Sequence, residues 1–213
     1  MADRVPLDFD PPVRRIRALL FGITDGHLTA PTPCPDWSVG DLLDHVMGLC
    51  RAFTQAAQKK TDAVTASPPP PPSTANLTPH WRSRLPVVLE GLATAWKQPT
   101  AWEGTAQAGG VTMPAAAMGT VAINELIMHG WDLARATGQE YAADPRTLEH
   151  LIEFLSQGPA EGTPGLFGPV VETDDEATLL DQALALAGRD PRWRPAPAPA
   201  DGIHTPSGST DAK

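Results

Sequence analysis

Residues Ala122-Ile-Asn-Glu-Leu-Ile-Met-His-Gly-Trp-Asp132 decide the fold of this chain. At about 100° per residue, Glu125, His129 and Asp132 share one stripe of a helix, because they are spaced i, i+4 and i+7. Apolar residues flank this stripe on both sides, so the helix has almost no solvated face and is expected to be buried. A buried carboxylate beside an imidazole needs compensation, and a divalent metal provides it because it binds a deprotonated carboxylate and a neutral imidazole.

The composition limits the classes of protein to which the chain can belong. With 213 residues and 41% hydrophobic content, it is long enough for one main domain with a single core. The formal charge of −9 and the lack of long basic clusters argue against nucleic-acid binding. The sequence has no apolar run of about 20 residues and no signal-peptide pattern near its start, so we expect a cytoplasmic protein without a membrane segment.

The two cysteines give no sign of a covalent framework. Cys34 lies in a Pro-Cys-Pro turn and Cys50 in an expected helix, and this spacing matches neither a disulfide pattern nor a paired-thiolate metal site. We therefore expect two reduced thiols without a role, of which Cys34 could be exposed.

Start and stop signals divide most of the chain into helices. They predict helices from Asp10 to about Asp25, from Ser38 through Phe53, from Thr78-Pro79 to about Trp96, from Pro114 to Thr137-Gly138, from Asp144-Pro145 through Leu155, and over 174–187. The second helix begins firmly, because Ser38 and Asp41 form a capping-box-like pair. Pro86 is expected to kink the third helix or to mark its true start.

The connections are rich in proline and glycine. A loop is expected over 61–78, because Pro68 to Pro72 favour polyproline II, and residues 99–113 suggest an irregular or hairpin-like link without a convincing strand ladder. We predict an all-α fold, a four-helix bundle with one or two short C-terminal helices. The bundle domain should cover 1–194, and 195–213 should be a disordered tail because it has too few apolar residues.

A third ligand for the metal has to come from another helix. The available histidines are His27, His45, His80, His129, His150 and His204. Only His45 combines a firmly capped helix with a position beside an apolar stripe, so in an antiparallel bundle it can face Glu125 and His129. Two histidines and one glutamate leave a coordination position open, as in catalytic metal sites. The spacing also fits a simpler interpretation, a helix-surface Glu–His pair and a core histidine.

Three stretches resemble one known family. They are Thr32-Pro-Cys-Pro-Asp-Trp-Ser-Val-Gly-Asp-Leu-Leu-Asp-His-Val46, Glu125-Leu-Ile-Met-His-Gly-Trp-Asp-Leu-Ala-Arg-Ala-Thr-Gly138 and Leu184-Ala-Leu-Ala-Gly-Arg-Asp-Pro191. From the first helix to Pro191, the chain resembles the actinobacterial branch of the DinB-like superfamily, related to the N-terminal domain of mycothiol-dependent maleylpyruvate isomerase. The resemblance implies a four-helix bundle that binds a divalent metal, zinc above all with nickel or another ion as alternatives, through His45, Glu125 and His129.

The chain departs from that family in two ways. The isomerase has an additional C-terminal domain, whereas here only one or two helices and a tail are expected, so its substrate contacts do not transfer. The proline insert at Pro68 to Pro72 is also not typical of the family.

The resemblance favours a metal-dependent enzyme that uses a small thiol, mycothiol first of all, either for S-transfer to an electrophile or for isomerisation of an activated double bond. Its partners would be this thiol and a small-molecule substrate, and the sequence is compatible with an oligomer. Asp132 would hold a ligand or bound water in place, or make a helix-end hydrogen bond. Arg135 and Asp41 could contact a polar thiol, although Asp41 has a capping role and Arg135 could be solvated. The alternative is a non-catalytic metal-binding bundle with a structural or vestigial site.

Overall fold

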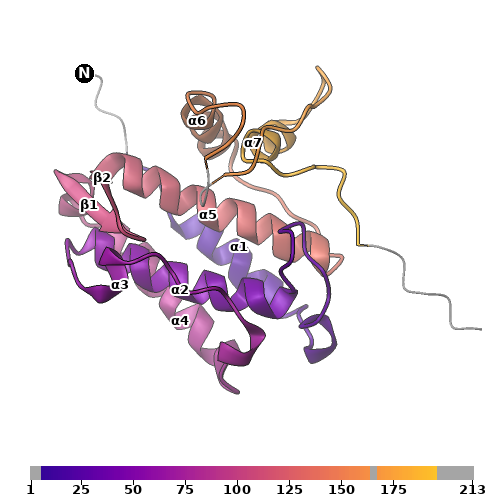
Figure 1. Cartoon of the computed structure of the whole chain (residues 1–213), viewed down its shortest axis with the longest axis horizontal. Coiled ribbons are helices and arrows are strands. Elements are labelled where there is room, and N and C mark those ends of the chain that lie inside the picture. Colours follow the sequence, from indigo (N-terminus) through magenta and orange to yellow (C-terminus); the bar gives the residue numbers. More distant parts are fainter. Residues whose placement is uncertain (1–5, 164–166, 196–213) are drawn as a thin grey trace, which may run out of the picture.

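The computed structural model describes residues 6–163 and 167–195, and within them the chain is mainly helical (Figure 1). The α-helices are α1 (Asp10–Leu20), α2 (Val39–Ala57), α3 (Ala63–Ala66), α4 (Trp81–Trp96), α5 (Ala115–Ala136), α6 (Pro145–Leu155) and α7 (Leu179–Leu186). Short 3-10 turns cover Asp25–His27, Thr74–Asn76 and Pro99–Trp102, and two strands, β1 (Thr105–Ala108) and β2 (Val111–Pro114), form a hairpin. The predicted all-α bundle is confirmed. The predicted tail lies outside the described residues, apart from Pro195.

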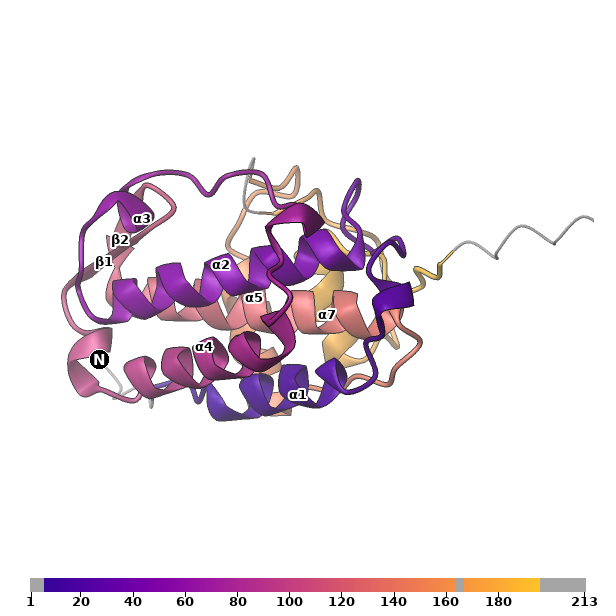
Figure 2. The same cartoon turned by 90° about the horizontal axis from the view of Figure 1, so that it is seen from below.

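Four helices, α1, α2, α4 and α5, lie side by side and enclose the core (Figure 2). Their facing stripes carry fully buried side chains such as Leu42, Leu89 and Ile123. Helix α5 is buried on nearly every side, as its sequence predicted, because α1 and α2 cover one side and the C-terminal helices lie on the other (Figure 1). No helix in the described part of the chain has the length and apolarity needed to cross a membrane.

Helix α2 begins at a complete capping box. Ser38 Oγ accepts from the backbone N–H of Asp41 (3.2 Å), and Asp41 Oδ2 accepts from the backbone N–H of Ser38 (2.9 Å). The other oxygen of Asp41 accepts from the backbone N–H of Thr74 (2.6 Å), which attaches the end of the proline-rich connection to α2. The cap thus fixes the first turn of the helix that carries His45.

The connection between α4 and α5 is a hairpin, as the glycines suggested. Gly109 and Gly110 form its turn with φ of +58° and +80°, a conformation that glycine adopts without strain. Within the described ranges, this hairpin is the only β-sheet. The backbone N–H of Gly110 donates to the carbonyl oxygen of Thr65 in α3 (2.9 Å). The proline run therefore lies in a connection whose two ends are tied down, at α3 and at Thr74.

Helices α1 and α7 are each about five residues shorter than predicted, and α4 begins at Trp81 instead of Thr78-Pro79. Helix α1 ends at Leu20 instead of about Asp25. Beyond it, the backbone N–H groups of residues 21–23 donate to carbonyl oxygens three residues earlier, and Gln139 Nε2 donates to Leu19 O (3.1 Å). Helix α7 begins at Leu179 instead of Asp174, because Thr178 Oγ1 caps it by accepting from the backbone N–H of Asp181 (3.2 Å).

The C-terminal helices α6 and α7 pack mainly on each other and lie against α5, with their axes running across it (Figures 1 and 2). Buried leucines such as Leu151 and Leu184 join the common core. Polar contacts also connect this pair to α5: Thr120 Oγ1 lies 3.1 Å from His150 Nε2, and Arg189, just after α7, reaches Asp132.

Candidate metal centre

The predicted stripe of α5 is the floor of the site. Glu125, His129 and Asp132 all project from this helix toward the segment that leads into α2 and toward α2 itself. His129 is 5% exposed and Asp132 is 0% exposed, so both polar groups are held inside the fold. Such burial requires partners for each polar atom, and the contacts below supply them.

His45 on α2 meets this stripe from across the bundle. Glu125 Oε2 lies 3.0 Å from His129 Nε2 and 3.8 Å from His45 Nε2, and the three candidate ligand atoms lie within 4.8 Å of one another. The side chains of His45 and Glu125 are each 14% exposed, so solvent reaches the cluster at these two residues. The ring of Trp37 packs on His45 with a centroid distance of 4.7 Å and forms part of the wall.

The protonation of the cluster follows from its contacts. Burial would raise the pKa of Glu125, but hydrogen bonds from His129 and His45 outweigh burial and hold this pKa well below its usual range. Burial lowers the pKa of His45. Burial alone would also lower the pKa of His129, but hydrogen bonds to Asp132, Cys34 and Glu125 raise it well above its ordinary value. The cluster thus offers a carboxylate and a neutral His45, and a bound cation would compete with the proton on His129 Nε2.

The donor set fits a divalent cation. Ligand atoms about 2 Å from a tetrahedral centre lie about 3.3 Å apart, and the two Glu125 distances, 3.0 and 3.8 Å, bracket that value. Imidazole nitrogens and a carboxylate suit zinc and several other first-row divalent ions. With His45, Glu125 and His129 as ligands, one or more positions would remain for water or an exogenous group.

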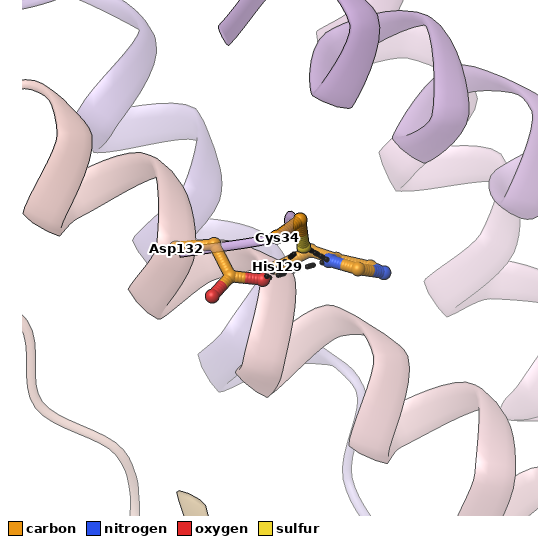
Figure 3. Close-up of side chains that lie close together, drawn as sticks. All are labelled: Cys34, His129 and Asp132. Carbon is orange, nitrogen blue, oxygen red and sulfur yellow. Dashed lines mark hydrogen bonds and ion pairs between the residues drawn. The ribbon is translucent and has the colours of Figure 1, made fainter. Parts of the chain in front are cut away.

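Behind the site, Asp132 joins a second polar cluster (Figure 3). Its Oδ2 accepts from His129 Nδ1–H (3.0 Å) and from the thiol of Cys34 (3.0 Å). The guanidinium of Arg189 donates from Nε to Asp132 Oδ1 (3.1 Å) and from Nη2 to Oδ2 (3.2 Å). Burial would raise the pKa of Asp132, but the bond from His129 and the charge of Arg189 outweigh burial and lower it. Asp132 is therefore an ionised, fully buried carboxylate.

Cys34, His129 and Asp132 also bring three possible ligand atoms within 4.8 Å of one another. This group already has a cation, because Arg189 Nη2 donates to both Cys34 Sγ (3.2 Å) and Asp132 Oδ2. Burial is the largest influence on the Cys34 thiol and raises its pKa, which disfavours a thiolate ligand. We therefore interpret this group as the support of His129 and not as a second metal site.

The structure corrects the expectation for Cys34. The sequence suggested a thiol without a role that could be exposed, but Cys34 is 5% exposed and contacts both Asp132 and Arg189. The extended proline-containing link turns back on itself: Thr32 Oγ1 accepts from the backbone N–H of Cys34 (3.1 Å), and Asp36 has a φ of +66°. This path carries Cys34 inward. The only sequence signal was its place in the motif that precedes α2.

Arg135 and Asp41 are held by other contacts. Arg135 Nη2 donates to Pro191 O (3.4 Å) and Trp193 O (3.2 Å), so it binds the segment that follows α7. Asp41 is engaged in the capping box and with Thr74. A direct contact of either residue with a substrate stays a prediction. The cation beside the site is Arg189, which the sequence analysis quoted in a family motif without assigning it a role.

Comparisons with known proteins point to one family. Residues 9–134 match the family model described as the mycothiol maleylpyruvate isomerase N-terminal domain. Two uncharacterized proteins of Mycobacterium tuberculosis, Rv0738 and MT0763, are each 29% identical over 192 residues, which cover 82% of this chain and 92% of each relative. Among solved structures, a mycothiol-dependent maleylpyruvate isomerase shares the fold with a TM-score of 0.50 and 20% identity, over 84% of this chain and 85% of that one.

Proposed function

Because this chain belongs to the family of the mycothiol maleylpyruvate isomerase N-terminal domain, we propose that it is a divalent-metal-dependent enzyme that uses a small thiol. Mycothiol is the thiol that the family name suggests, and zinc is the metal that the ligand set favours. The reaction would be either isomerisation of an activated double bond or S-transfer to an electrophile.

The observation that carries this proposal is the convergence of His45, Glu125 and His129 on one point from two helices. Three ligands with an exposed side are typical of metal sites that bind a reactant, whereas structural zinc sites are closed by four protein ligands. The 14% exposure of the His45 and Glu125 side chains supports an entrance for a thiol. The same exposure argues against the closed cage expected of a purely structural site.

When bound, the cation would lower the pKa of a thiol at the open position, and the resulting thiolate would be the nucleophile of the reaction. The residues of the chain orient the ligands for it. Asp132 accepts the Nδ1–H of His129 and so leaves the lone pair of Nε2 directed at the site. The hydrogen bonds from Cys34 and Arg189 hold the carboxylate of Asp132 in place.

The thiol must come from outside the chain. Cys34 lies on the Nδ1 side of His129, behind the ligand atoms, and its pKa is raised by burial. Cys50 is buried in the apolar core, and burial raises its pKa to about 12. Neither side chain is available as a nucleophile, so the proposal requires a soluble thiol that approaches from the partly exposed side of His45.

For an isomerisation, the thiol sulfur would add to one carbon of the double bond, the resulting single bond would rotate, and loss of the thiol would restore the double bond. The thiol is regenerated in this sequence, so it acts catalytically. For S-transfer, the sulfur stays on the electrophile and its proton leaves with the displaced group or is taken up by the addition product. Both reactions begin with the same nucleophile, so one site can serve either.

The test compares turnover in variants that remain folded under the assay conditions. Glu125→Gln removes the ligand charge with little change in shape, and we expect turnover of a cis-unsaturated or electrophilic substrate with mycothiol to fall about 100-fold or more while folding is retained. His80→Ala is the matched control, because His80 is an exposed histidine before α4, and it should leave turnover unchanged.

A spectroscopic measurement separates the enzyme from the non-catalytic alternative. In protein loaded with cobalt, added mycothiol should change the absorption spectrum, since sulfur would join the ligands. A cobalt absorption spectrum that does not change with saturating mycothiol or other small thiols would contradict the thiol-dependent reaction. It would favour a metal-binding bundle without catalysis.

A further inference from the structure

Arg189 comes from outside the part of the chain that matches the family model, residues 9–134. It lies three residues beyond the last residue of α7 and directly after Gly188, whose φ of +79° lets the chain turn sharply at the helix end. The backbone N–H of Arg189 donates to Leu184 O (2.8 Å), and a side chain on Gly188 would lie 2.7 Å from the backbone of Gly168. Arg189 is thus placed by a well-defined helix end.

The side chain of Arg189 reaches back into the bundle. It makes hydrogen bonds with both carboxylate oxygens of Asp132 and with Cys34 Sγ, at 3.1 to 3.3 Å. The pair is buried, with side-chain exposures of 16% for Arg189 and 0% for Asp132. Loss of one partner from a buried pair is costly, because the other charge then remains without compensation.

We infer that Arg189 is a positioning residue that couples the docking of the C-terminal helices α6 and α7 to metal affinity at His45, Glu125 and His129. This inference rests on the proposed metal site. The coupling passes through two contacts: Arg189 holds Asp132, and Asp132 holds Nδ1–H of His129, whose Nε2 faces Glu125. The C-terminal segment therefore completes a site whose ligands all lie in the family domain.

The arrangement of the helices supports a coupling of this kind. Helices α6 and α7 pack mainly on each other and less extensively on α5, and the side chains of His150 and Arg189 connect them to Thr120 and Asp132 of α5. Arg189 is the side chain from this segment that touches the support of a ligand. Coupling between two binding events is reciprocal, so a metal that favours the Asp132–His129 arrangement should also favour the docked C-terminal segment.

The first experiment is a double-mutant cycle on zinc affinity, measured by competition with a chromophoric chelator. Arg189→Met and Asp132→Asn should each weaken zinc binding about 10- to 100-fold, the range typical of residues that support a metal ligand. The double variant should bind zinc no more weakly than Asp132→Asn alone, to within about twofold, because Arg189 acts through Asp132. Additive losses would overturn the proposed coupling through Asp132.

Arg192→Met is the matched control. Arg192 lies three residues further along the same segment, its side chain is 77% exposed, and it pairs with Asp190. Like Arg189→Met, this substitution removes one positive charge from the segment after α7, but it leaves the contact between Arg189 and Asp132 intact. The zinc affinity of Arg192→Met should therefore equal that of the unmodified protein. An equal loss in Arg192→Met would mean that general electrostatics, not the Asp132 contact, controls metal affinity.

The second experiment needs no variant and remains valid even if Arg189→Met fails to fold. Hydrogen exchange is followed by mass spectrometry in the full chain with and without zinc. Zinc should slow amide exchange in α7 (Leu179–Leu186) as well as around His129 in α5. Protection confined to α5, with α7 unchanged, would overturn the coupling.

These outcomes are distinguishable from failure of the proposed function. If zinc does not bind, or if it binds equally well after substitution of His45 or Glu125, the proposed metal site itself is rejected. Normal zinc binding with unaltered affinity in Arg189→Met, in protein that folds, would leave the metal site intact and reject the role of Arg189.

Discussion

The thiol of Cys34 donates to Asp132 Oδ2 across 3.0 Å, although 98 residues separate the two positions in the sequence. The contact joins the extended link before α2 to the central helix α5 and adds a third donor to the buried carboxylate, besides His129 and Arg189. Cys50 is also buried in the core, but the thiol hydrogen bonds among the described residues all belong to Cys34. The two thiols of the chain are therefore expected to respond differently to the same substitutions.

Cys34→Ala should destabilise the folded state by about 1–3 kcal/mol, because it removes a hydrogen-bond donor from a buried carboxylate. Cys34→Ser keeps a donor and should cost less than about 1 kcal/mol. Denaturant unfolding of the two variants gives the comparison. At Cys50, the serine variant should not be more stable than the alanine variant. If serine were favoured equally at both positions, the contact with Asp132 would not be the cause of the difference at Cys34.

Metal removal should lower thermal stability, because a ligand that binds only the folded state stabilises it. Zinc present at about 1,000 times its dissociation constant contributes about 4 kcal/mol, so a chelator should lower the melting temperature by roughly 10 °C. His129→Ala should lower the melting temperature and abolish the effect of the chelator, whereas His80→Ala should retain it. A chelator without effect on protein shown to contain zinc would place the metal outside the folded core.

The cap of α2 should give a measurable dependence of stability on pH. Burial would raise the pKa of Asp41, but hydrogen bonds from Ser38 and Thr74 outweigh burial and lower it below its ordinary 3.8. A carboxyl whose pKa is lowered by folding stabilises the folded state above the unfolded pKa, and this contribution disappears as pH falls through the folded pKa.

Asp41→Asn should therefore cost about 1 kcal/mol near neutral pH, since hydrogen bonds to a charged acceptor are the stronger ones. The difference from the unmodified protein should shrink as the pH falls below 3.8. Urea unfolding at a series of pH values measures both. A difference that stays constant into strong acid would mean that the charge of Asp41 does not contribute to the cap.

The packing of α5 against the rings of Trp96 and Trp102, which contact each other edge to face, depends on Gly119. A Cβ atom there would lie 2.5 Å from the ring of Trp102 and 2.9 Å from that of Trp96. Gly119→Ala should therefore destabilise the protein by about 1–3 kcal/mol through overpacking. Gly48→Ala on α2 is the matched control: it has no neighbouring atom within 4 Å and should stabilise by about 0.5–1 kcal/mol through helix propensity.

The sequence predicted those parts of the site that depend on local periodicity. Glu125, His129 and Asp132 follow from helical spacing, and His45 follows from the cap that fixes the start of α2. Their convergence required only that α2 pack on α5, which a four-helix bundle provides. The proposed metal at these residues rests on the family resemblance and on the donor set, and the chelator experiment tests it.

Cys34 and Arg189 could not be predicted in the same way, because their positions depend on the path of irregular backbone. The link before α2 turns at Asp36, and the chain after α7 turns at Gly188, both with positive φ. Periodicity says nothing about the direction in which such a segment leaves a helix. The boundaries of α1 and α7 also differed from the prediction: i→i−3 hydrogen bonds replace the α-helical ones after Leu20, and Thr178 caps the start of α7.

The three segments that meet at Asp132 also bear on the kinetics of folding. Cys34 precedes it by 98 residues and Arg189 follows it by 57, so these contacts close long loops. Closing loops of this length lowers the conformational entropy of the chain before the contacts can stabilise it. We therefore expect these contacts to form after the folding transition state. Substitutions at Cys34 and Arg189 should then accelerate unfolding with little change in the folding rate. The lifetime of the assembled site would be set by the rate at which these contacts open.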